Sequence, residues 1–393
     1  MKRILLITHE ASRTGAPLVV LHFARWLRAA HPEVGVDVLA LKGGPLAEEF
    51  RKVADQYVEL VMPPLPERSL ASRAGLRLLR MLGFARVPTS AEWKEMQLAQ
   101  LAGKRFDAVL ANSLASIPVG GRIKDLAIVR PTLIAFIHEL GSVIKRDLPD
   151  LPERLRAVDG VWAASDLVRT ELLEKWSVPS GIVEVQYECA AVPEGGGQAS
   201  PVQGGAALHV GGSGLASLRK GYDLFIQVAR WVRVNHPEMD IRFTWVGRVA
   251  PHDRPLIDHD LEHAGLRGVV DFIGELADPR PVYGTFDVFL LTSREDPFPL
   301  VCIETGSMGK PIVCFEGATG TAEVLRKGGG MIVPYLDVEA MGRAVVDYAR
   351  DPERRRMDGE LNRVQFANFG PDQQCPLMWE RITAAWKEKA SKR

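Results

Sequence analysis

Residues 293–313 read S-R-E-D-P-F-P-L-V-C-I-E-T-G-S-M-G-K-P-I-V, a pattern typical of a strand that leads into a helix. The apolar run at 287–292 immediately precedes this stretch and has the composition of a buried strand. Pro299 suits the first helical position, where a missing N–H costs nothing. A carboxylate, Glu304, then lies about one turn inside the predicted helix.

A helix that begins directly after a strand is a favourable site for a phosphate group. The first backbone amides of a helix have no partner within the helix, and the helix dipole adds positive charge there. We therefore expect the amides of Phe298, Leu300 and Val301 to donate to a bound diphosphate. Asp296 and Glu304 flank this site, eight positions apart, and their carboxylates can accept hydrogen bonds from hydroxyls on either side.

This stretch resembles the signature of the family 4 glycosyltransferases, which is E-x7-E, a small-residue helix and then G-x-P-[IV]-[IV]. Here Asp296-x7-Glu304 is followed by G-K-P-I-V at 309–313, so an Asp stands where the family has its first Glu. The S-R-E-D-P-F-P segment is similar to that of a bacterial branch of the family. The resemblance covers nearly the whole chain and is clearer in the second half.

The resemblance implies an α/β fold of the GT-B type, with two Rossmann-like domains whose parallel sheets face each other across a cleft. It also implies transfer of a hexose from a nucleoside diphosphate sugar, with retention of configuration and without a metal. No D-x-D sequence follows a predicted strand, which agrees with the expected absence of a metal. The nucleotide sugar is a co-substrate, so no other cofactor is expected.

The composition is that of an ordinary globular protein. Its 393 residues exceed the usual size of one hydrophobic core, so two domains are expected. The formal net charge is zero, which gives no reason to expect a nucleic acid partner. The four cysteines are scattered, which argues against a zinc site and for reduced thiols. The apolar run at 4–7 is too short for a signal peptide or a membrane span, so we expect a cytoplasmic protein.

Short apolar runs alternate with helical patterns, which indicates buried parallel sheets. In the first half the predicted strands are 4–7, 36–40, 57–61, 107–111, 133–137, 161–164 and 183–187. In the second half they are 206–210, 241–246, 269–273, 287–292, 311–315 and 331–333.

A Gly/Pro-rich segment at 193–205 separates the two sets of strands and is the predicted linker. We therefore expect a first, acceptor-side domain at 1–192 and a second, donor-side domain at 206–375. Residues 376–393 have apolar side chains at helical spacing, and the resemblance implies a C-terminal helix that crosses back to the first domain.

A glycine-rich loop follows the first strand of the second half and ends in two cations, Arg219 and Lys220, before a predicted helix. Two cations beside a helix terminus would stabilise the negative charge that grows on a leaving diphosphate. The family has a Lys and an Arg that bind the diphosphate, and Lys220 matches the Lys directly. Gly212 stands in place of the family's Arg and is expected to contact the donor, and Arg219 is the candidate substitute for the missing charge. The alternative is a solvated loop. We expect the base near Gly274.

In the first half, Gly15 lies in a turn where its small size would let a substrate approach the backbone. His9 and Glu10 end the first predicted strand, and Asn112 ends another, so these three residues are candidates for the acceptor side. His138 also follows a predicted strand, and the family often carries a histidine there, near the reacting sugar. A structural role for each of them stays open.

Two further acidic residues, Glu295 and Glu323, lie near these motifs. Glu295 precedes Asp296 but is out of spacing with Glu304, so we interpret it as a neighbour of the contact. Glu323 lies in a G-T-A-E sequence that resembles the family's G-x-x-E turn, and both a structural and a functional role stay open.

Residues 68–86 contain five arginines and no acidic residue, with leucines at roughly helical spacing. Such a basic amphipathic stretch can lie on anionic lipid, which would place the protein at the inner face of a membrane. The alternative is an ordinary surface helix. The expected acceptor is a glycan or a lipid-linked glycan.

Three other functions compete with the transferase. A nucleotide-sugar 2-epimerase shares the architecture, and a non-catalytic relative is permitted by the departures at Asp296 and Gly212. An NAD-dependent oxidoreductase is suggested by the G-x-G at Gly212 and Gly214, but the third glycine of G-x-G-x-x-G is missing.

Overall fold

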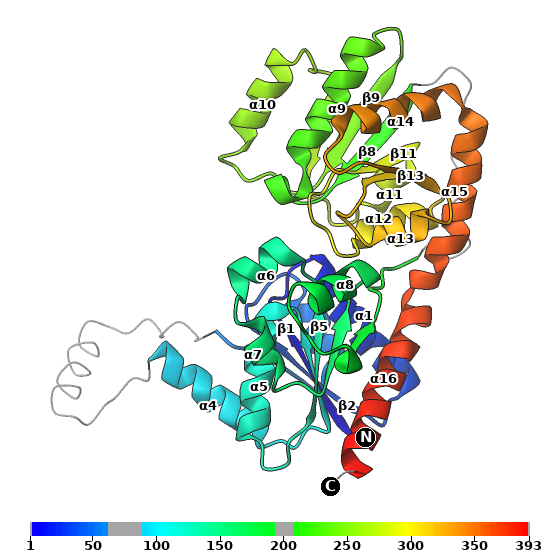
Figure 1. Ribbon diagram of the computed structural model, residues 1–393. Helices are drawn as coiled ribbons and strands as arrows, with labels where there is room; N and C mark the ends of the chain where they lie inside the picture. The colour runs from blue at the N-terminus through cyan, green and yellow to red at the C-terminus, as the bar shows by residue number, and fades with distance from the viewer. Residues whose placement is uncertain (1, 62–88, 193–206, 392–393) are drawn as a thin grey trace, which may run out of the picture. The chain divides into compact units, whose positions relative to one another are not determined.

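The computed structural model describes residues 2–61, 89–192 and 207–391 (Figure 1). The predicted linker at 193–205 and the basic stretch at 68–86 lie outside these residues. The chain divides into two compact units, the first made of Met1–Ala135, Glu153–Gly160 and Ile382–Arg393, and the second of Phe136–Pro152 and Val161–Arg381. The domain boundaries expected from the sequence stay predictions, because the segment that would separate the domains is not described.

Seven strands form the first sheet, in the order β3-β2-β1-β4-β5-β6-β7. The strands are β1 (Arg3–Thr8), β2 (Gly35–Ala40), β3 (Gln56–Glu59), β4 (Ala108–Asn112), β5 (Thr132–Ile137), β6 (Gly160–Ala163) and β7 (Val183–Val185). The helices that accompany them are α1 (Gly15–Ala30), α2 (Ala47–Val53), α4 (Ser90–Ala102), α5 (Ile117–Leu126), α6 (Gly141–Asp147), α7 (Leu151–Leu155) and α8 (Asp166–Glu174).

Six strands form the second sheet, in the order β10-β9-β8-β11-β12-β13. They are β8 (Leu208–Ser213), β9 (Ile241–Val246), β10 (Val270–Gly274), β11 (Val288–Leu291), β12 (Ile312–Phe315) and β13 (Gly330–Val333). The helices are α9 (Tyr222–Asn235), α10 (Arg254–His263), α11 (Arg280–Gly284), α12 (Leu300–Ser307), α13 (Thr321–Leu325), α14 (Val338–Arg350), α15 (Pro352–Phe366) and α16 (Pro371–Ser391).

The predicted fold class, two parallel-sheet α/β domains, is confirmed, and every predicted strand is present. The strands are found because buried parallel strands are apolar along their whole length. Three strand ends differ from the prediction by two residues or more, and one is that of β3, which ends at Glu59 and not at 61. Strand β8 continues through Gly211 and Gly212 to Ser213, since these glycines pack inside the sheet. Strand β7 ends at Val185 and not at 187.

Two helix beginnings also differ from the prediction. Helix α12 begins at Leu300, and Pro299 is its cap, with an extended ψ of 129° and a carbonyl that accepts from Cys302 N at 2.9 Å. Helix α16 begins at Pro371, so that Pro376 lies inside the helix. The Arg381 guanidinium on α16 donates to the carbonyl oxygen of Val185 on β7 at 2.6 Å.

In each sheet the order in which successive strands are added reverses at one point. This point lies between β1 and β4 in the first sheet, and between β8 and β11 in the second. In doubly wound sheets, ligands bind beyond the carboxyl ends of the strands at such a point. The loops that follow β8 and β11 are the two stretches predicted to hold a diphosphate. Of the predicted acceptor-side residues, His9 and Glu10 directly follow β1, and Asn112 is the last residue of β4.

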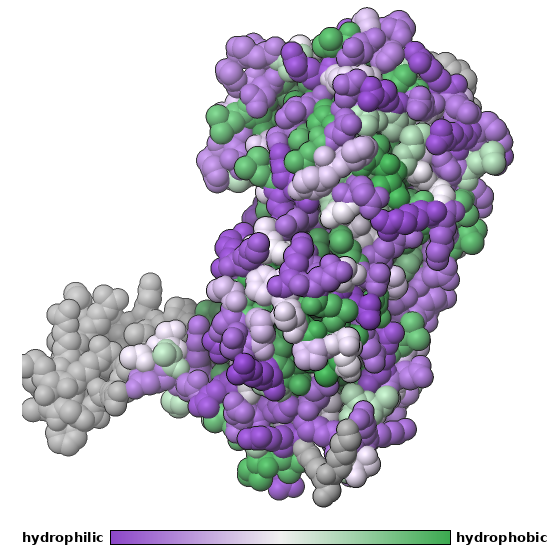
Figure 2. Space-filling view, viewed as in Figure 1, coloured by the Kyte–Doolittle hydropathy of each residue, from purple (hydrophilic) through white to green (hydrophobic). Residues whose placement is uncertain are grey.

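The visible surface is mainly hydrophilic, with hydrophobic residues in scattered groups (Figure 2). Among the helices of residues 2–61, 89–192 and 207–391, none combines the length and the apolar character needed to cross a membrane.

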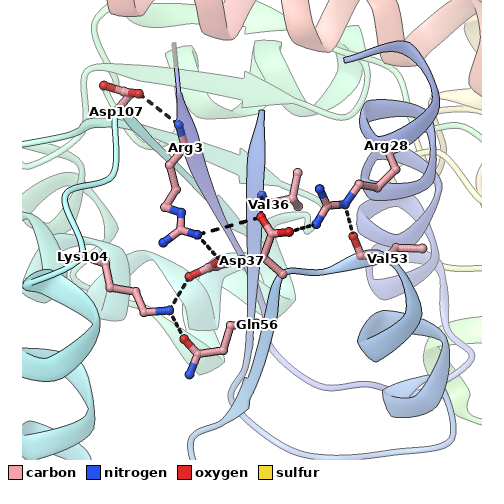
Figure 3. A network of polar contacts seen from close by, with 9 residues as sticks. Arg3, Arg28, Val36, Asp37, Val53, Gln56, Lys104 and Asp107 are labelled. Atoms are coloured by element: carbon pink, nitrogen blue, oxygen red, sulfur yellow. Dashed lines mark hydrogen bonds and ion pairs between the residues drawn. The ribbon is translucent and has the colours of Figure 1, made fainter. Parts of the chain in front are cut away.

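A polar network joins the amino-terminal ends of several strands of the first sheet (Figure 3). Asp37 of β2 is buried, and its carboxylate accepts a hydrogen bond from Lys104 Nζ at 2.9 Å and lies 3.8 Å from the Arg3 guanidinium. Lys104 also donates to Gln56 of β3. The backbone amide of Arg3 donates to Asp107, directly before β4, at 3.1 Å. One buried carboxylate therefore ties three strands together at the sheet end opposite the predicted ligand loops.

We predict that Asp37→Asn lowers the free energy of unfolding by about 1–3 kcal/mol, because the buried negative charge that faces Lys104 and Arg3 is lost while the side-chain size is kept. Glu48→Gln is the control, because Glu48 pairs with Arg51 on the surface and is 76% exposed. It should cost less than about 0.5 kcal/mol. Urea unfolding measures both variants, and equal losses would contradict the role given to Asp37.

Candidate functional site

The loops that follow β8 and β11 are joined by a partly buried ion pair. The ammonium of Lys220 lies 2.6 Å from Asp296 Oδ2, and the Ser293 hydroxyl donates to the same oxygen at 3.0 Å. The Asp296 side chain is 7% exposed and that of Lys220 is 19% exposed. Two residues predicted from separate motifs are therefore in direct contact, at the point where the strand order reverses.

Arg294 holds the turn that carries the two predicted cations. Its guanidinium makes two hydrogen bonds to the carboxylate of Asp223, at 2.9 and 2.8 Å, and also donates to the carbonyl oxygen of Leu218. Its backbone amide donates to the Arg219 carbonyl oxygen at 2.8 Å. The Arg219 guanidinium in turn donates to the carbonyl oxygen of Glu295 at 2.8 Å. Sequence reasoning missed Arg294, whose partner Asp223 lies 71 positions away.

Gly221 permits the close approach of the two loops. It has a left-handed backbone, with φ of 73°, and caps α9. A Cβ atom at this position would lie only 1.9 Å from the carbonyl oxygen of Thr292. A residue with a side chain would therefore push the Lys220 turn away from the loop that carries Asp296.

Gly212 has a different role from the one its place in the motif suggested. It lies inside β8, and a Cβ there would come within 2.8 Å of both the Phe225 and Trp245 rings. Its small size is therefore used for core packing, and the helix after this loop begins only at Tyr222. This distance from the helix argues against the dinucleotide fingerprint. Gly274 ends β10 with φ of 82°, and its carbonyl oxygen accepts from Gly247 N at 2.8 Å.

Glu304 lies on α12, and burial raises the pKa of its carboxyl group to about 7. The charge of Arg280 lowers this pKa and that of Asp278 raises it. Arg280 and Asp278 pair with each other at 2.7 and 2.9 Å. Burial foremost, and then the charge of Glu304, also raise the pKa of Tyr283, which is hydrogen-bonded to Ser213. Sequence reasoning missed these neighbours of Glu304.

The helix start at 298–301 is formed partly by packing. The ring of Phe298 is buried and lies 4.9 Å from the rings of Tyr187 and of Phe369, centroid to centroid. Its side chain is therefore structural, and only its backbone amide is suited to a ligand. Leu300 and Val301 open α12, where amides have no partner within the helix.

Glu295 and Glu323 both act as caps for other helices. Glu295 accepts hydrogen bonds from the backbone amide and hydroxyl of Ser142, at the start of α6. Glu323 accepts from Leu167 N at 2.8 Å, at the start of α8, and from the Tyr187 hydroxyl at 3.0 Å. These contacts favour the structural interpretation of Glu323 and agree with Glu295 being a neighbour of the predicted contact.

The predicted residues of the first unit gather at the ends of β1 and β4. His9 Nε2 lies 3.7 Å from Glu10 Oε1, and Gly15 is the first residue of α1. Asn112 pairs in register with Thr8, and its side-chain amide donates to the carbonyl oxygen of Ala16 at 3.0 Å. All four residues thus lie at one end of the first sheet.

His138 follows β5 and forms a buried pair with a residue that sequence reasoning missed. Its Nδ1 atom lies 2.8 Å from Glu188 Oε1, and the two side chains are 5% and 7% exposed. The imidazole also lies 4.0 Å from the ring of Phe136, centroid to centroid. No local pattern joins Glu188 to His138, since 50 positions separate them.

Comparisons with known proteins found a matching family model, sequence relatives and solved structures of the same fold. Residues 207–351 match the family model of the glycosyl transferases group 1. The mannosyltransferase LpcC of lipopolysaccharide core biosynthesis in Rhizobium leguminosarum is 26% identical over 56% of this chain and 63% of its own length. An exopolysaccharide phosphotransferase of Streptomyces coelicolor is 28% identical over 42% of this chain and 17% of its own length. The chain thus spans less than two thirds of each of these relatives.

The chain is similar to the solved structure of Anabaena HepE in complex with UDP-glucose, with a TM-score of 0.77 and 17% identity. The superposition covers 98% of this chain and 100% of the HepE chain. This likeness shows the fold alone. Among the described residues, no group of three or more His, Cys, Asp or Glu side chains is arranged to hold a metal ion. The fold is thus that of the GT-B glycosyltransferases, and residues 207–351 carry the match to glycosyl transferases group 1.

The raised pKa of Glu304 predicts a pH-dependent stability. When the pKa of a carboxyl is higher in the folded state than in the unfolded state, its contribution to stability is fully present at a pH below the unfolded pKa. This contribution is lost as the pH rises through the folded pKa, which is about 7 for Glu304. Between pH 5 and 8, wild type should therefore lose on the order of 2–3 kcal/mol relative to Glu304→Gln. Urea unfolding at both pH values measures this change, and a difference that is independent of pH would contradict it.

Proposed function

We propose that the protein is a retaining, metal-independent glycosyltransferase of family 4, which moves a hexose from a nucleoside diphosphate sugar to a hydroxyl of a glycan acceptor. The observation that carries the proposal is the contact of Lys220 with Asp296 where β8 and β11 end, with Glu304 on the helix that follows. The group 1 family match at 207–351 and the likeness to a mannosyltransferase support it. The UDP-glucose complex of a protein with the same fold also supports it.

The donor would be held by groups from both loops. Lys220 and Arg219 supply positive charge for the diphosphate, and the amides at Leu300 and Val301 supply hydrogen-bond donors. Glu304 accepts hydrogen bonds from the ribose hydroxyls in its ionised form. Asp296 orients hydroxyls of the sugar, and we place the base near Gly274.

The chemical step needs no group beyond the two substrates and these residues. The acceptor oxygen bonds to the anomeric carbon while the bond from that carbon to the diphosphate breaks. The acceptor proton passes to the leaving diphosphate on the same face of the sugar, so the configuration is retained. Lys220 and Arg219 stabilise the charge that grows on the leaving group, in place of a metal ion. His138 positions the sugar or stabilises the transition state.

On the acceptor side we assign His9, Glu10 and Asn112, and we assign Gly15 to the binding of the donor. The acceptor we propose is a glycan or a lipid-linked glycan of a polysaccharide pathway. A cytoplasmic location and a contact of residues 68–86 with anionic lipid stay predictions. A nucleotide-sugar 2-epimerase and a non-catalytic relative are the alternatives that the test below has to separate.

The first test is thermal unfolding with GDP, UDP, dTDP or NAD, with and without EDTA. We expect one nucleoside diphosphate to raise the melting temperature, because a ligand that binds only the folded state stabilises it. EDTA should not change this shift. Lys220→Ala should weaken that binding about 10- to 100-fold, the effect of one lost charge-assisted hydrogen bond. Lys175→Ala is the control, because Lys175 caps the end of α8, its side chain is 66% exposed, and its partner Glu171 lies on the same helix.

Product analysis then separates the alternatives. The matching nucleotide sugar should yield nucleoside diphosphate and a glycoside or, without an acceptor, slow release of the sugar with retained configuration. An isomerised nucleotide sugar would identify an epimerase instead. A shift with NAD alone, or no shift with any nucleotide, would contradict the proposal.

A further inference from the structure

The imidazole of His138 is held on two sides by buried groups. Phe136 of β5 lies against it at 4.0 Å between ring centroids, and Phe136 is itself braced edge-on by Trp162 of β6. Glu188 makes the second contact, and its Oε1 atom lies 2.8 Å from His138 Nδ1. The carboxylate of Glu139 accepts a hydrogen bond from the backbone amide of His138 at 2.9 Å, so two carboxylates contact His138.

Glu188 lies on a segment that is fixed on both sides. Before it, the Gln186 amide nitrogen donates to the Ala163 carbonyl oxygen at 2.9 Å, and the Gln186 side chain donates to that of Gln374 on α16 at 3.0 Å. After it, Ala190 N donates to the carbonyl oxygen of Phe369 at 3.2 Å. The backbone on both sides of Glu188 is therefore fixed by hydrogen bonds, which restricts where its carboxylate can lie.

A purely structural reason for this pair is weak. Two ionisable groups buried together lose more hydration than their attraction returns in many proteins, and apolar side chains of similar size would stabilise as well. When a histidine has a chemical task, a buried carboxylate bound to one ring nitrogen fixes the tautomer and the orientation of the imidazole. The family match itself begins only at residue 207, so it assigns nothing to Glu188.

We propose that Glu188 is the positioning residue of His138. Its carboxylate accepts a hydrogen bond from the N–H group at Nδ1, and this bond fixes both the orientation of the ring and its tautomer. Nε2 is then the ring nitrogen that contacts a hydroxyl of the donor sugar. This inference rests on the proposed function for the identity of the sugar. The hydrogen on Nδ1 does not depend on it and is observable in the protein alone.

The first measurement is the nitrogen-15 NMR spectrum of protein with labelled histidine, which reports which ring nitrogen carries hydrogen. His138→Gln assigns the signals among the nine histidines. We expect hydrogen on Nδ1 in wild type and in Glu188→Gln, whose amide oxygen still accepts it. Glu188→Ala should lose this preference. A bare Nδ1 in wild type, or an unchanged spectrum in Glu188→Ala, would overturn the proposal.

The second measurement separates positioning from stability. With the nucleotide sugar whose nucleotide stabilises the protein, Glu188→Ala should lower kcat for sugar release about 10- to 100-fold, as misplaced catalytic groups do. Its affinity for the nucleoside diphosphate should not change, and Glu188→Gln should restore most of kcat. Removing Glu188 should have little further effect in a His138→Ala background, since the two residues act as one unit.

Glu184→Gln is the matched control, because Glu184 lies on β7 with a side chain that is 62% exposed and paired with Arg381. It should leave both the spectrum and kcat unchanged. Nucleotide affinity that falls together with kcat in Glu188→Ala would mean a merely structural role and would overturn the inference. If wild type binds none of the nucleotides, the proposed function fails, while the NMR result still decides whether Glu188 fixes His138.

Discussion

The close approach of the loops after β8 and β11 is the constraint on which the candidate site depends. It requires a glycine at 221, because any Cβ there would collide with the carbonyl oxygen of Thr292. It brings the ammonium of Lys220 to 2.6 Å from Asp296, and Arg294 joins the backbones of both loops. Neither loop alone carries a complete set of charges, so the site exists only where the two strands lie side by side.

The electrostatic character of this region suits a ligand with negative and polar parts. The positive groups, Lys220 and Arg219, lie on the β8 side, and the start of α12 adds unpaired backbone donors. The acidic groups lie on the β11 side, where burial raises the pKa of the Glu304 carboxyl to about 7. Because these groups are fixed by the fold, they need little rearrangement when charge develops on a leaving group.

Much of the fold could be predicted from the sequence because buried parallel strands leave a simple pattern of apolar runs. The order of the motifs also placed Lys220 and Asp296 correctly after neighbouring strands. Contacts between distant segments leave no such pattern. Glu188 meets His138 across 50 positions, and Arg294 meets Asp223 across 71, so both were missed.

Other details depend on packing that a sequence does not display. Gly212 appeared to be a ligand-binding glycine, yet its space is filled by Phe225 and Trp245. Pro299 caps α12 and does not start it, a difference of one residue that only the backbone angles decide. The raised pKa of Glu304 follows from its burial, and the helical position alone could not predict it.

A crystal structure with a bound nucleoside diphosphate would test the central claim most directly. The account predicts the diphosphate against Lys220 and the first amides of α12, with the ribose hydroxyls on Glu304. A nucleotide bound elsewhere, with Lys220 still paired to Asp296 and no ligand at α12, would contradict it.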